Sequence, residues 1–205
     1  MVNIVFGIKL LKAKQKQHIR TKKKGKRGKL SPEEVAVRSA QIAMAFLEEF
    51  DLNNKSVLIY LPQKGSNEVD TWQLLDDLLN EGAKVYASVY DHEQNQIEVS
   101  EVDEKTEFIE DKLGIPTPQK ARMIEKEDSI KLDLIIIPLI AFDLKGNRIG
   151  HGKGTYDRFL KSSVTRNAIK IGLAYDFQLV KKGIPAEAND VEIDYCITDE
   201  RIYKF

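Results

Sequence analysis

The sequence contains one cysteine and no long apolar run, and each scarcity excludes a class of protein. Cys196 has no second cysteine with which to form an internal disulfide, which is typical of a reducing compartment. No window approaches the roughly 18 apolar residues of a membrane-spanning helix. The apolar start, residues 1–12, lacks the basic region and cleavage site of a secretory signal, and it reads as an amphipathic strand or the start of a helix. We therefore expect a cytoplasmic protein without a membrane partner.

Acidic residues are absent from positions 1–32, whereas the segment from Lys9 to Lys29 carries 11 basic residues. The rest of the chain has 21 basic and 32 acidic residues, so the formal net charge of zero hides an uneven distribution. Such a segment can be a solvated lysine-rich face, a nucleic-acid contact or part of a site for a smaller anion. Residues 14–29 contain no Phe, Tyr or Trp on which bases could stack, which argues against nucleic acid.

Two helices are predicted by their start signals and apolar spacing. Ser31, Pro32 and Glu34 form an N-cap, a first-turn proline and a capping box. The core-facing positions that follow are Val35, Val37, Ile42, Ala45 and Phe46. The second helix is expected within residues 67–82, with its apolar positions at Trp72, Leu75, Leu78 and Leu79 and its end at Gly82.

Apolar and β-branched runs predict strands between and after these helices. They cover residues 55–62, 83–91, 96–102, 132–143 and 168–175, and residues 194–205 are expected to form a closing strand and hairpin. Residues 113–119 form a proline-bearing loop, from which a charged stretch leads to Lys131. The most apolar run, 132–143, predicts a central strand covered on both faces. A chain of 205 residues is long enough for one such core, and the rhythm predicts a single α/β domain: a three-layer sandwich with a mostly parallel central sheet flanked by helices.

The stretch "GNRIGHGKGTYDRF", residues 146–159, follows the predicted central strand and precedes a helix expected over residues 155–161. Gly150, Gly152 and Gly154 tolerate unusual backbone angles and leave room for backbone N–H groups to converge on an anion. Arg148 and Lys153 add positive charge. Ligands of open α/β sheets bind beyond the carboxyl ends of the strands, where this loop lies.

The spacing of the loop matches neither the P-loop nor the dinucleotide-binding fingerprint. On spacing alone, a phosphate cradle and a plain flexible turn remain equally open. Asp157, just inside the predicted helix, is either a favourable partner for the helix dipole or a Mg²⁺ ligand. Asp190 is a second candidate ligand whose distance from Asp157 the sequence leaves open.

Residues 133–160, "DLIIIPLIAFDLKGNRIGHGKGTYDRFL", resemble the hallmark segment of the 5-formyltetrahydrofolate cyclo-ligases, also called 5,10-methenyltetrahydrofolate synthetases. The resemblance continues in family order through the basic segment to "LSPEE", then "NEVDT", "GIPTP" and "PAEANDVEID", and it spans nearly the whole chain. It implies a single domain, residues 1–205, in which the basic segment 1–30 contributes to an ATP site.

The resemblance implies ATP- and Mg²⁺-dependent conversion of 5-formyltetrahydrofolate to 5,10-methenyltetrahydrofolate, with release of ADP and phosphate. Phosphoryl transfer to the formyl oxygen would give an iminium phosphate, and attack by the second folate nitrogen would then expel phosphate. Such chemistry needs alignment of two substrates and neutralisation of charge more than covalent work by the protein. A folate- or nucleotide-binding protein without turnover is the alternative.

By the same resemblance, the chain's residues receive roles one by one. The ATP contacts are Lys16, Arg20, Arg148, Gly150, His151, Gly152, Lys153, Gly154, Thr155 and Tyr156. The folate contacts are Glu68, His151, Gly152, Lys153, Gly154, Thr155 and Tyr156. Lys153 and Arg148 are the expected catalytic residues, and Asp157 and Asp190 are the expected Mg²⁺ ligands. The expected partners are the small-molecule substrates, and no nucleic acid is expected to bind. The protein is expected to be a monomer.

Three positions depart from the family pattern. Leu139 stands where glycine follows the proline, Thr155 replaces the first of two tyrosines, and His151 stands where Arg or Tyr is common. We expect Thr155 to reshape a folate or ATP contact. Glu68 is expected to accept hydrogen bonds from the pterin, Tyr156 to pack on the folate rings, and Trp72 to belong to helix core.

Overall fold

The computed structural model describes residues 2–123 and 130–205 of the 205-residue chain. Its helices are α1 (Val2–Arg27), α2 (Pro32–Glu49), α3 (Trp72–Asn80) and α4 (Thr155–Phe159), with short 3₁₀ turns η2 (Ser163–Thr165) and η3 (Asp176–Gln178). The strands are β1 (Ser56–Ile59), β2 (Lys84–Asp91), β3 (Gln96–Val102), β4 (Phe108–Glu110), β5 (Pro116–Pro118), β6 (Arg122–Met123), β7 (Leu134–Pro138), β8 (Ala141–Phe142), β9 (Arg148–Ile149), β10 (Ile169–Ala174), β11 (Tyr195–Thr198) and β12 (Ile202–Lys204).

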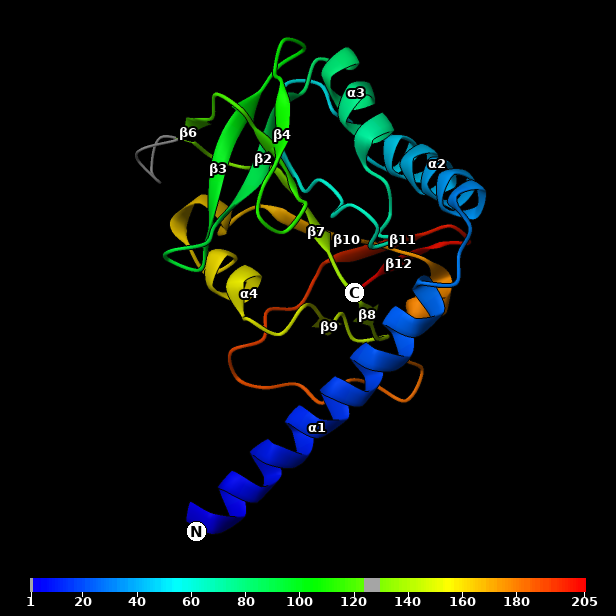
Figure 1. Ribbon diagram of the computed structural model, residues 1–205, viewed down its shortest axis with the longest axis vertical. Coiled ribbons are helices and arrows are strands. Elements are labelled where there is room, and N and C mark those ends of the chain that lie inside the picture. Colours follow the sequence, from blue (N-terminus) through cyan, green and yellow to red (C-terminus); the bar gives the residue numbers. More distant parts are fainter. Residues whose placement is uncertain (1, 124–129) are drawn as a thin grey trace.

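Within the described residues, eight strands form one sheet in the order β12-β11-β10-β7-β1-β2-β3-β6 (Figure 1). The five central strands, from β11 to β2, run parallel, whereas the edge strands β12, β3 and β6 pair antiparallel. Two hairpins, β4–β5 and β8–β9, stand outside this sheet. The prediction of an α/β sandwich with a mostly parallel central sheet is confirmed.

The sheet is covered on both faces, and β7 shows this residue by residue. Leu134 and Ile136 pack into the core beneath α2 and α3, while Ile135 and Ile137 pack into the opposite core, which includes Phe159 of α4. All four β7 side chains are buried. The apolar run therefore lacks alternation because neither face of a central parallel strand meets water. Figure 1 shows α2 and α3 together on one side of the sheet and α4 on the other.

The capping box of α2 is present: the Ser31 hydroxyl accepts a hydrogen bond from the Glu34 N–H at 3.2 Å, and the Glu34 carboxylate accepts from the Ser31 N–H at 2.8 Å. Ile42 and Phe46 are fully buried, as predicted. Val37 was wrongly placed on the core face and is 60% exposed. Val37 lies about 200° around the helix from Val35, so it points to the opposite side although the two residues are close in sequence.

Several element boundaries differ from the prediction. The predicted second helix begins only at Trp72, since residues 67–71 have no regular secondary structure and Asn67 has a φ of +50°, which is incompatible with a right-handed helix. The predicted strand 132–143 ends at Pro138, which has no N–H to continue a ladder, and residues 141–142 form β8 instead. The proline loop contains the short strand β5. Part of the charged stretch leading to Lys131 lies outside the described residues.

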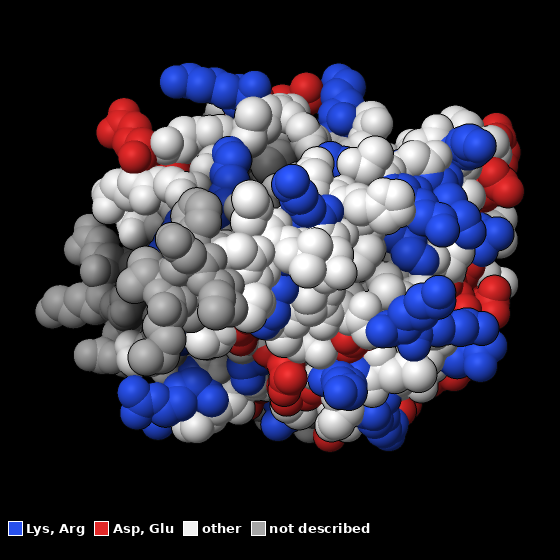
Figure 2. Space-filling view, turned by 90° about the horizontal axis from the view of Figure 1, so that it is seen from below, with Lys and Arg blue, Asp and Glu red and all other residues white. Residues whose placement is uncertain are grey.

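Helix α1 covers the basic segment. The apolar start of the chain, for which the sequence left a strand or a helix open, is also helical. The N-terminal end of α1 projects from the body of the protein (Figure 1). Lys22, Lys24 and Lys26 of α1 are exposed, and the face seen from this end carries basic side chains over much of its area, with acidic ones among them (Figure 2). Across residues 2–123 and 130–205, no helix combines the length and apolar character needed to span a membrane.

Gly146, at the turn of the β8–β9 hairpin, offers a test of how this hairpin joins the sheet. Its φ is +80°, and an added Cβ would lie 2.7 Å from the Ile193 carbonyl oxygen. Gly82 has a similar φ of +77° with open space around a Cβ. We expect Gly82→Ala to cost about 1–2 kcal/mol from the left-handed conformation alone, and Gly146→Ala clearly more because backbone must also move. Urea unfolding measures both; equal losses would show that the residue 193 backbone shifts freely.

Candidate active site

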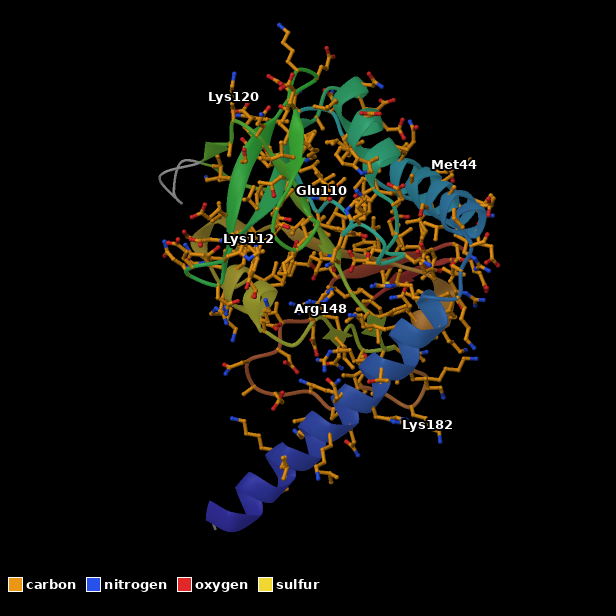
Figure 3. The ribbon with its side chains drawn as sticks, in the orientation of Figure 1. Met44, Glu110, Lys112, Lys120, Arg148 and Lys182 are labelled. Atoms are coloured by element: carbon orange, nitrogen blue, oxygen red, sulfur yellow. The ribbon has the colours of Figure 1, made fainter. Side chains whose placement is uncertain are left out.

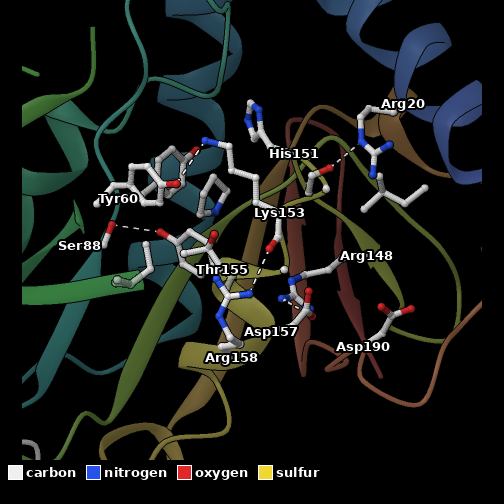
Figure 4. A pocket seen from close by; sticks show the side chains of 18 of the residues that line it. Arg20, Tyr60, Ser88, Arg148, His151, Lys153, Thr155, Asp157, Arg158 and Asp190 are labelled. Carbon is white, nitrogen blue, oxygen red and sulfur yellow. Dashed lines mark hydrogen bonds and ion pairs between the residues drawn. The ribbon is translucent and has the colours of Figure 1, made fainter. Parts of the chain in front are cut away.

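A cavity of about 960 Å³ lies beyond the carboxyl ends of β1, β2 and β7. Its walls come from α1, from the segments after β1 and β7, from the β2–β3 hairpin and from residues 187–190. Side chains from these separate parts of the chain point into one space, as Figure 4 shows for Arg20, Ser88 and Asp190 among others. This edge of the sheet is where ligands of open α/β folds bind.

The glycine loop, residues 150–154, forms one wall of the cavity. Gly152 and Gly154 have φ of +97° and +67°, which L side chains rarely adopt. A Cβ on Gly152 would also lie 3.1 Å from a guanidinium nitrogen of Arg20, so glycine here lets α1 approach. Gly150 does not have a positive φ, so the expectation that all three glycines serve unusual angles is wrong at this position.

Helix α1 reaches the cavity with two of its basic side chains. Arg20 Nε donates to the Gly150 carbonyl at 2.9 Å. Lys16 Nζ lies 2.8 Å from a Glu187 oxygen and 2.6 Å from Asp190 Oδ2, with only 12% of its side chain exposed. Burial lowers the pKa of Lys16, but its hydrogen bonds and ion pairs with Asp190 and Glu187 outweigh burial and leave the pKa raised. The burial of Arg20 lowers its pKa.

A buried carboxylate, Glu68, stands in the segment that follows β1. One of its oxygens lies 3.4 Å from the Arg27 guanidinium and 3.3 Å from His151 Nε2, and the other accepts from the Gln63 N–H at 3.2 Å. Burial raises the pKa of Glu68, yet the hydrogen bond to His151, the charge of Arg27, the electrostatic interaction with His151 and the Gln63 N–H together leave the pKa lowered. Glu68 is thus an ionised acceptor at the cavity wall at neutral pH.

The two expected metal ligands approach each other through the backbone. Asp157 Oδ1 accepts from Arg148 at 2.9 Å and from the Val191 N–H at 3.2 Å, and Val191 directly follows Asp190. Arg148 also donates to the Val191 carbonyl and is central to the molecule in Figure 3. Among the described residues, no group of three or more His, Cys, Asp or Glu could hold a metal. A pair of carboxylates nevertheless fits Mg²⁺ that is bound mainly through substrate phosphates.

Lys153 and Tyr156 come from the same loop but lie in different surroundings. Lys153 Nζ lies 4.9 Å from the centroid of the Tyr90 ring and 3.2 Å from its hydroxyl. Tyr156 packs against the core, its hydroxyl lies 3.0 Å from the Ser88 hydroxyl, and burial raises its pKa. The ring that lies beside Lys153 in the cavity is therefore that of Tyr90.

All thirteen residues that received a site role in the sequence analysis line this cavity, although the roles themselves stay predictions. Sequence reasoning missed an apolar wall formed by Tyr60, Leu61, Ile97, Leu113 and Ile115, together with Ser88 and Tyr90. The position of Tyr60, Ser88 and Tyr90 at the ends of predicted strands was the available signal. Trp72, expected in helix core, is 36% exposed and packs edge-on against Phe108.

Similarity to known proteins extends over most of the chain. Residues 12–199 match the 5-formyltetrahydrofolate cyclo-ligase family. The chain belongs to this family of enzymes. The resemblance found in the loop and the basic segment is therefore confirmed, and the cavity holds the residues on which it rested.

Three relatives of this cyclo-ligase family member show the extent of the likeness. The mitochondrial 5-formyltetrahydrofolate cyclo-ligase of Arabidopsis thaliana is 31% identical over 70% of this chain, and the match spans only 59% of the plant protein. A probable 5-formyltetrahydrofolate cyclo-ligase of Caenorhabditis elegans is 30% identical over 93% of this chain and 94% of its own. The structure of Aquifex aeolicus 5,10-methenyltetrahydrofolate synthetase has a TM-score of 0.75, 33% identity and 92% coverage of both chains.

The ionised state of Glu68 predicts a pH-dependent stability. Because its folded pKa lies below the ordinary 4.5, its contribution is present above that pH and is lost as the pH falls through the folded pKa. We expect Glu68→Gln to lower the free energy of unfolding by about 1–3 kcal/mol near neutral pH, since Arg27 is only 3% exposed and loses its anionic partner. Urea unfolding should show this difference shrinking under acidic conditions.

Glu110→Gln is the matched control, because Glu110 pairs with Lys64 at the surface, where both side chains are more than half exposed. Its loss should stay below about 1 kcal/mol at any pH. Equal effects of the two substitutions near neutral pH would contradict the assignment of Glu68 as a buried ionised partner of Arg27.

Proposed function

We propose that this chain catalyses the ATP- and Mg²⁺-dependent conversion of 5-formyltetrahydrofolate to 5,10-methenyltetrahydrofolate, with release of ADP and phosphate. The observation that carries the proposal is the single cavity of about 960 Å³ that joins a basic, glycine-lined part to an apolar part with a carboxylate. A volume of this size holds two substrates side by side. Membership of the cyclo-ligase family supports the same reaction.

The triphosphate binds against α1 and the glycine loop. Lys16, Arg20 and Lys153 supply positive charge from two sides of that part of the cavity, which suits an anion with several negative charges. The turn at Gly152 leaves backbone accessible beside Arg20. The buried guanidinium of Arg148 donates a hydrogen bond to Asp157 and so orients this carboxylate.

Asp157 and Asp190 would hold Mg²⁺ together with the phosphates, and the ion would neutralise phosphate charge. Asp190 Oδ2 accepts hydrogen bonds from Lys16 and the Glu187 N–H, which hold the carboxylate in place. Lys16 is thus placed where a phosphate oxygen bound beside the metal would be a further partner for its ammonium group.

The folate lies along the opposite wall. Glu68, ionised and near His151, accepts hydrogen bonds from the pterin amino and ring N–H groups, and the wall containing Leu61, Ile97 and Ile115 takes the apolar faces of the rings. Tyr156 lines the cavity and keeps the ring contact that the resemblance assigned to it, and the Tyr90 ring offers a second aromatic face beside Lys153.

The reaction then proceeds in two displacements. The formyl oxygen attacks the γ-phosphorus, the bond to the ADP oxygen breaks, and an iminium phosphate forms. The second folate nitrogen attacks the activated carbon, and the C–O bond breaks to release phosphate. Lys153 stabilises the charge of the transferring phosphoryl group, while the cavity aligns the two substrates. In this scheme no side chain of the protein forms a covalent bond with a substrate.

The direct test is the growth of the near-ultraviolet absorbance band of methenyltetrahydrofolate. Wild-type protein mixed with 5-formyltetrahydrofolate, ATP and Mg²⁺ should produce the band, and omission of either ATP or Mg²⁺ should abolish it. Binding of both substrates without any band would overturn the proposal in favour of a folate- and nucleotide-binding protein without turnover.

Lys153→Ala tests the stabilising charge itself. We expect turnover to fall by the equivalent of about 2–4 kcal/mol, roughly 30- to 1,000-fold, because one positioned charge at a developing anion is worth that much. Lys145→Ala is the matched control: Lys145 is an exposed lysine eight residues earlier that does not line the cavity. Similar rates for the two variants would remove Lys153 from this role.

A further inference from the structure

The tip of the β2–β3 hairpin is hydrogen-bonded to α4, the helix that directly follows the glycine loop, through Asn95. Its side-chain oxygen accepts from the Tyr90 hydroxyl at 2.7 Å and from the Thr155 hydroxyl at 3.3 Å. Its backbone carbonyl accepts from Arg158, whose guanidinium also donates to the Lys153 carbonyl at 3.1 Å. Asn95 therefore contacts the start of α4 with both its side chain and its backbone.

The hydrogen bond between Tyr90 and Asn95 fixes the direction of the tyrosine proton. Asn95 Oδ1 can only accept, so the single phenolic proton of Tyr90 points at it. The phenolic oxygen then offers its lone pairs to Lys153 Nζ, which can only donate and lies 3.2 Å away. The three groups form a chain in which each bond polarises the next.

Lys153 needs such support because its side chain is otherwise unconstrained. The residue is exposed, and its four-carbon stem has many rotamers. Within the described residues, the ammonium group contacts the ring and the hydroxyl of Tyr90. A charge that stabilises a transition state acts best when it is already in place. The hairpin tip thus limits the positions that Lys153 can take above the cavity.

We propose that Asn95 is a positioning residue for Lys153, acting through Tyr90, and that Thr155 holds Asn95 in place. The inference deepens the proposed function and rests on it. It also gives the departure at Thr155 a physical role, since a short hydroxyl side chain at this position reaches Asn95 Oδ1. Asn95 has a φ of +53°, a conformation in which asparagine is one of the few tolerated residues.

The test compares Asn95→Gly with Asn95→Asp, in the wild-type and the Lys153→Ala backgrounds. Glycine accepts the positive φ but lacks the acceptor, whereas aspartate keeps an oxygen acceptor of the same shape. Gln94→Gly is the control, because it places a glycine at an exposed position of the same turn. For each variant, kcat and KM come from the absorbance assay, and the Kd for ATP comes from calorimetric titration.

We expect Asn95→Gly to lower kcat about tenfold and to leave KM for the folate nearly unchanged, while Asn95→Asp and Gln94→Gly stay within about twofold of wild type. In the Lys153→Ala background, Asn95→Gly should have no further effect on either kcat or the ATP Kd. A tenfold loss that persists without Lys153, or a change confined to KM for the folate, overturns the proposal in favour of a direct substrate contact or a general effect on structure.

The ATP titration separates this inference from the proposed reaction. If wild-type protein produces no methenyltetrahydrofolate, the proposed function fails. A loss of ATP affinity in the Asn95→Gly variant that occurs only when Lys153 is present would still support the positioning role. Equal ATP affinities for wild type and Asn95→Gly, together with equal kcat where turnover exists, would eliminate it.

Discussion

The parallel pairing of β1, β2, β7 and β10 is the constraint on which the site depends. Parallel strands end at the same edge of the sheet, so the residues that follow them meet there although they are far apart in sequence. Tyr60 follows β1, Tyr90 lies at the end of β2, and Pro138 ends β7; all three line one cavity. The core on both faces of β7 holds these ends in register, because a shift by one residue would exchange the side chains of the two faces.

The strands alone leave the cavity open on the side where α1 closes it. This helix contains no acidic residue, and its charge is offset by carboxylates that come from elsewhere in the chain. Lys16 meets Glu187 and Asp190, while Arg27 meets Glu68. Buried ion pairs of this kind add little net stability, but removal of one partner is costly, so they specify where the helix lies. The uneven charge distribution of the sequence is in this sense an internal complementarity as well as a site for phosphate.

The sequence predicted the elements with strong local signals and missed those that depend on distant contacts. The α2 capping box lies within four residues, and the apolar run of β7 needs only burial on both faces, so both were predictable. Strand β5 was not, because residues rich in proline form a strand there only by pairing with β4. In the site, the glycine loop was predicted from its own glycines and basic residues, and the family resemblance supplied the roles. The Asn95–Tyr90–Lys153 chain was not predicted, because the bond between Tyr90 and Lys153 joins residues 63 positions apart and no local spacing encodes it.

Asp190 shows how the same carboxylate serves both the free and the loaded site. In this structure the Lys16 ammonium and the Glu187 N–H donate to Asp190 Oδ2, so the charge of the carboxylate is balanced without a metal. Under the proposed function, a phosphate oxygen would become a further partner of Lys16, and Mg²⁺ would share the oxygens of Asp190. Lys16 would keep its ion pair with Glu187, and Asp190 would keep the hydrogen bond from the Glu187 N–H, so neither buried charge would be left without a partner. Because Lys16 belongs to α1, the proposed function couples the position of this helix to occupation of the site.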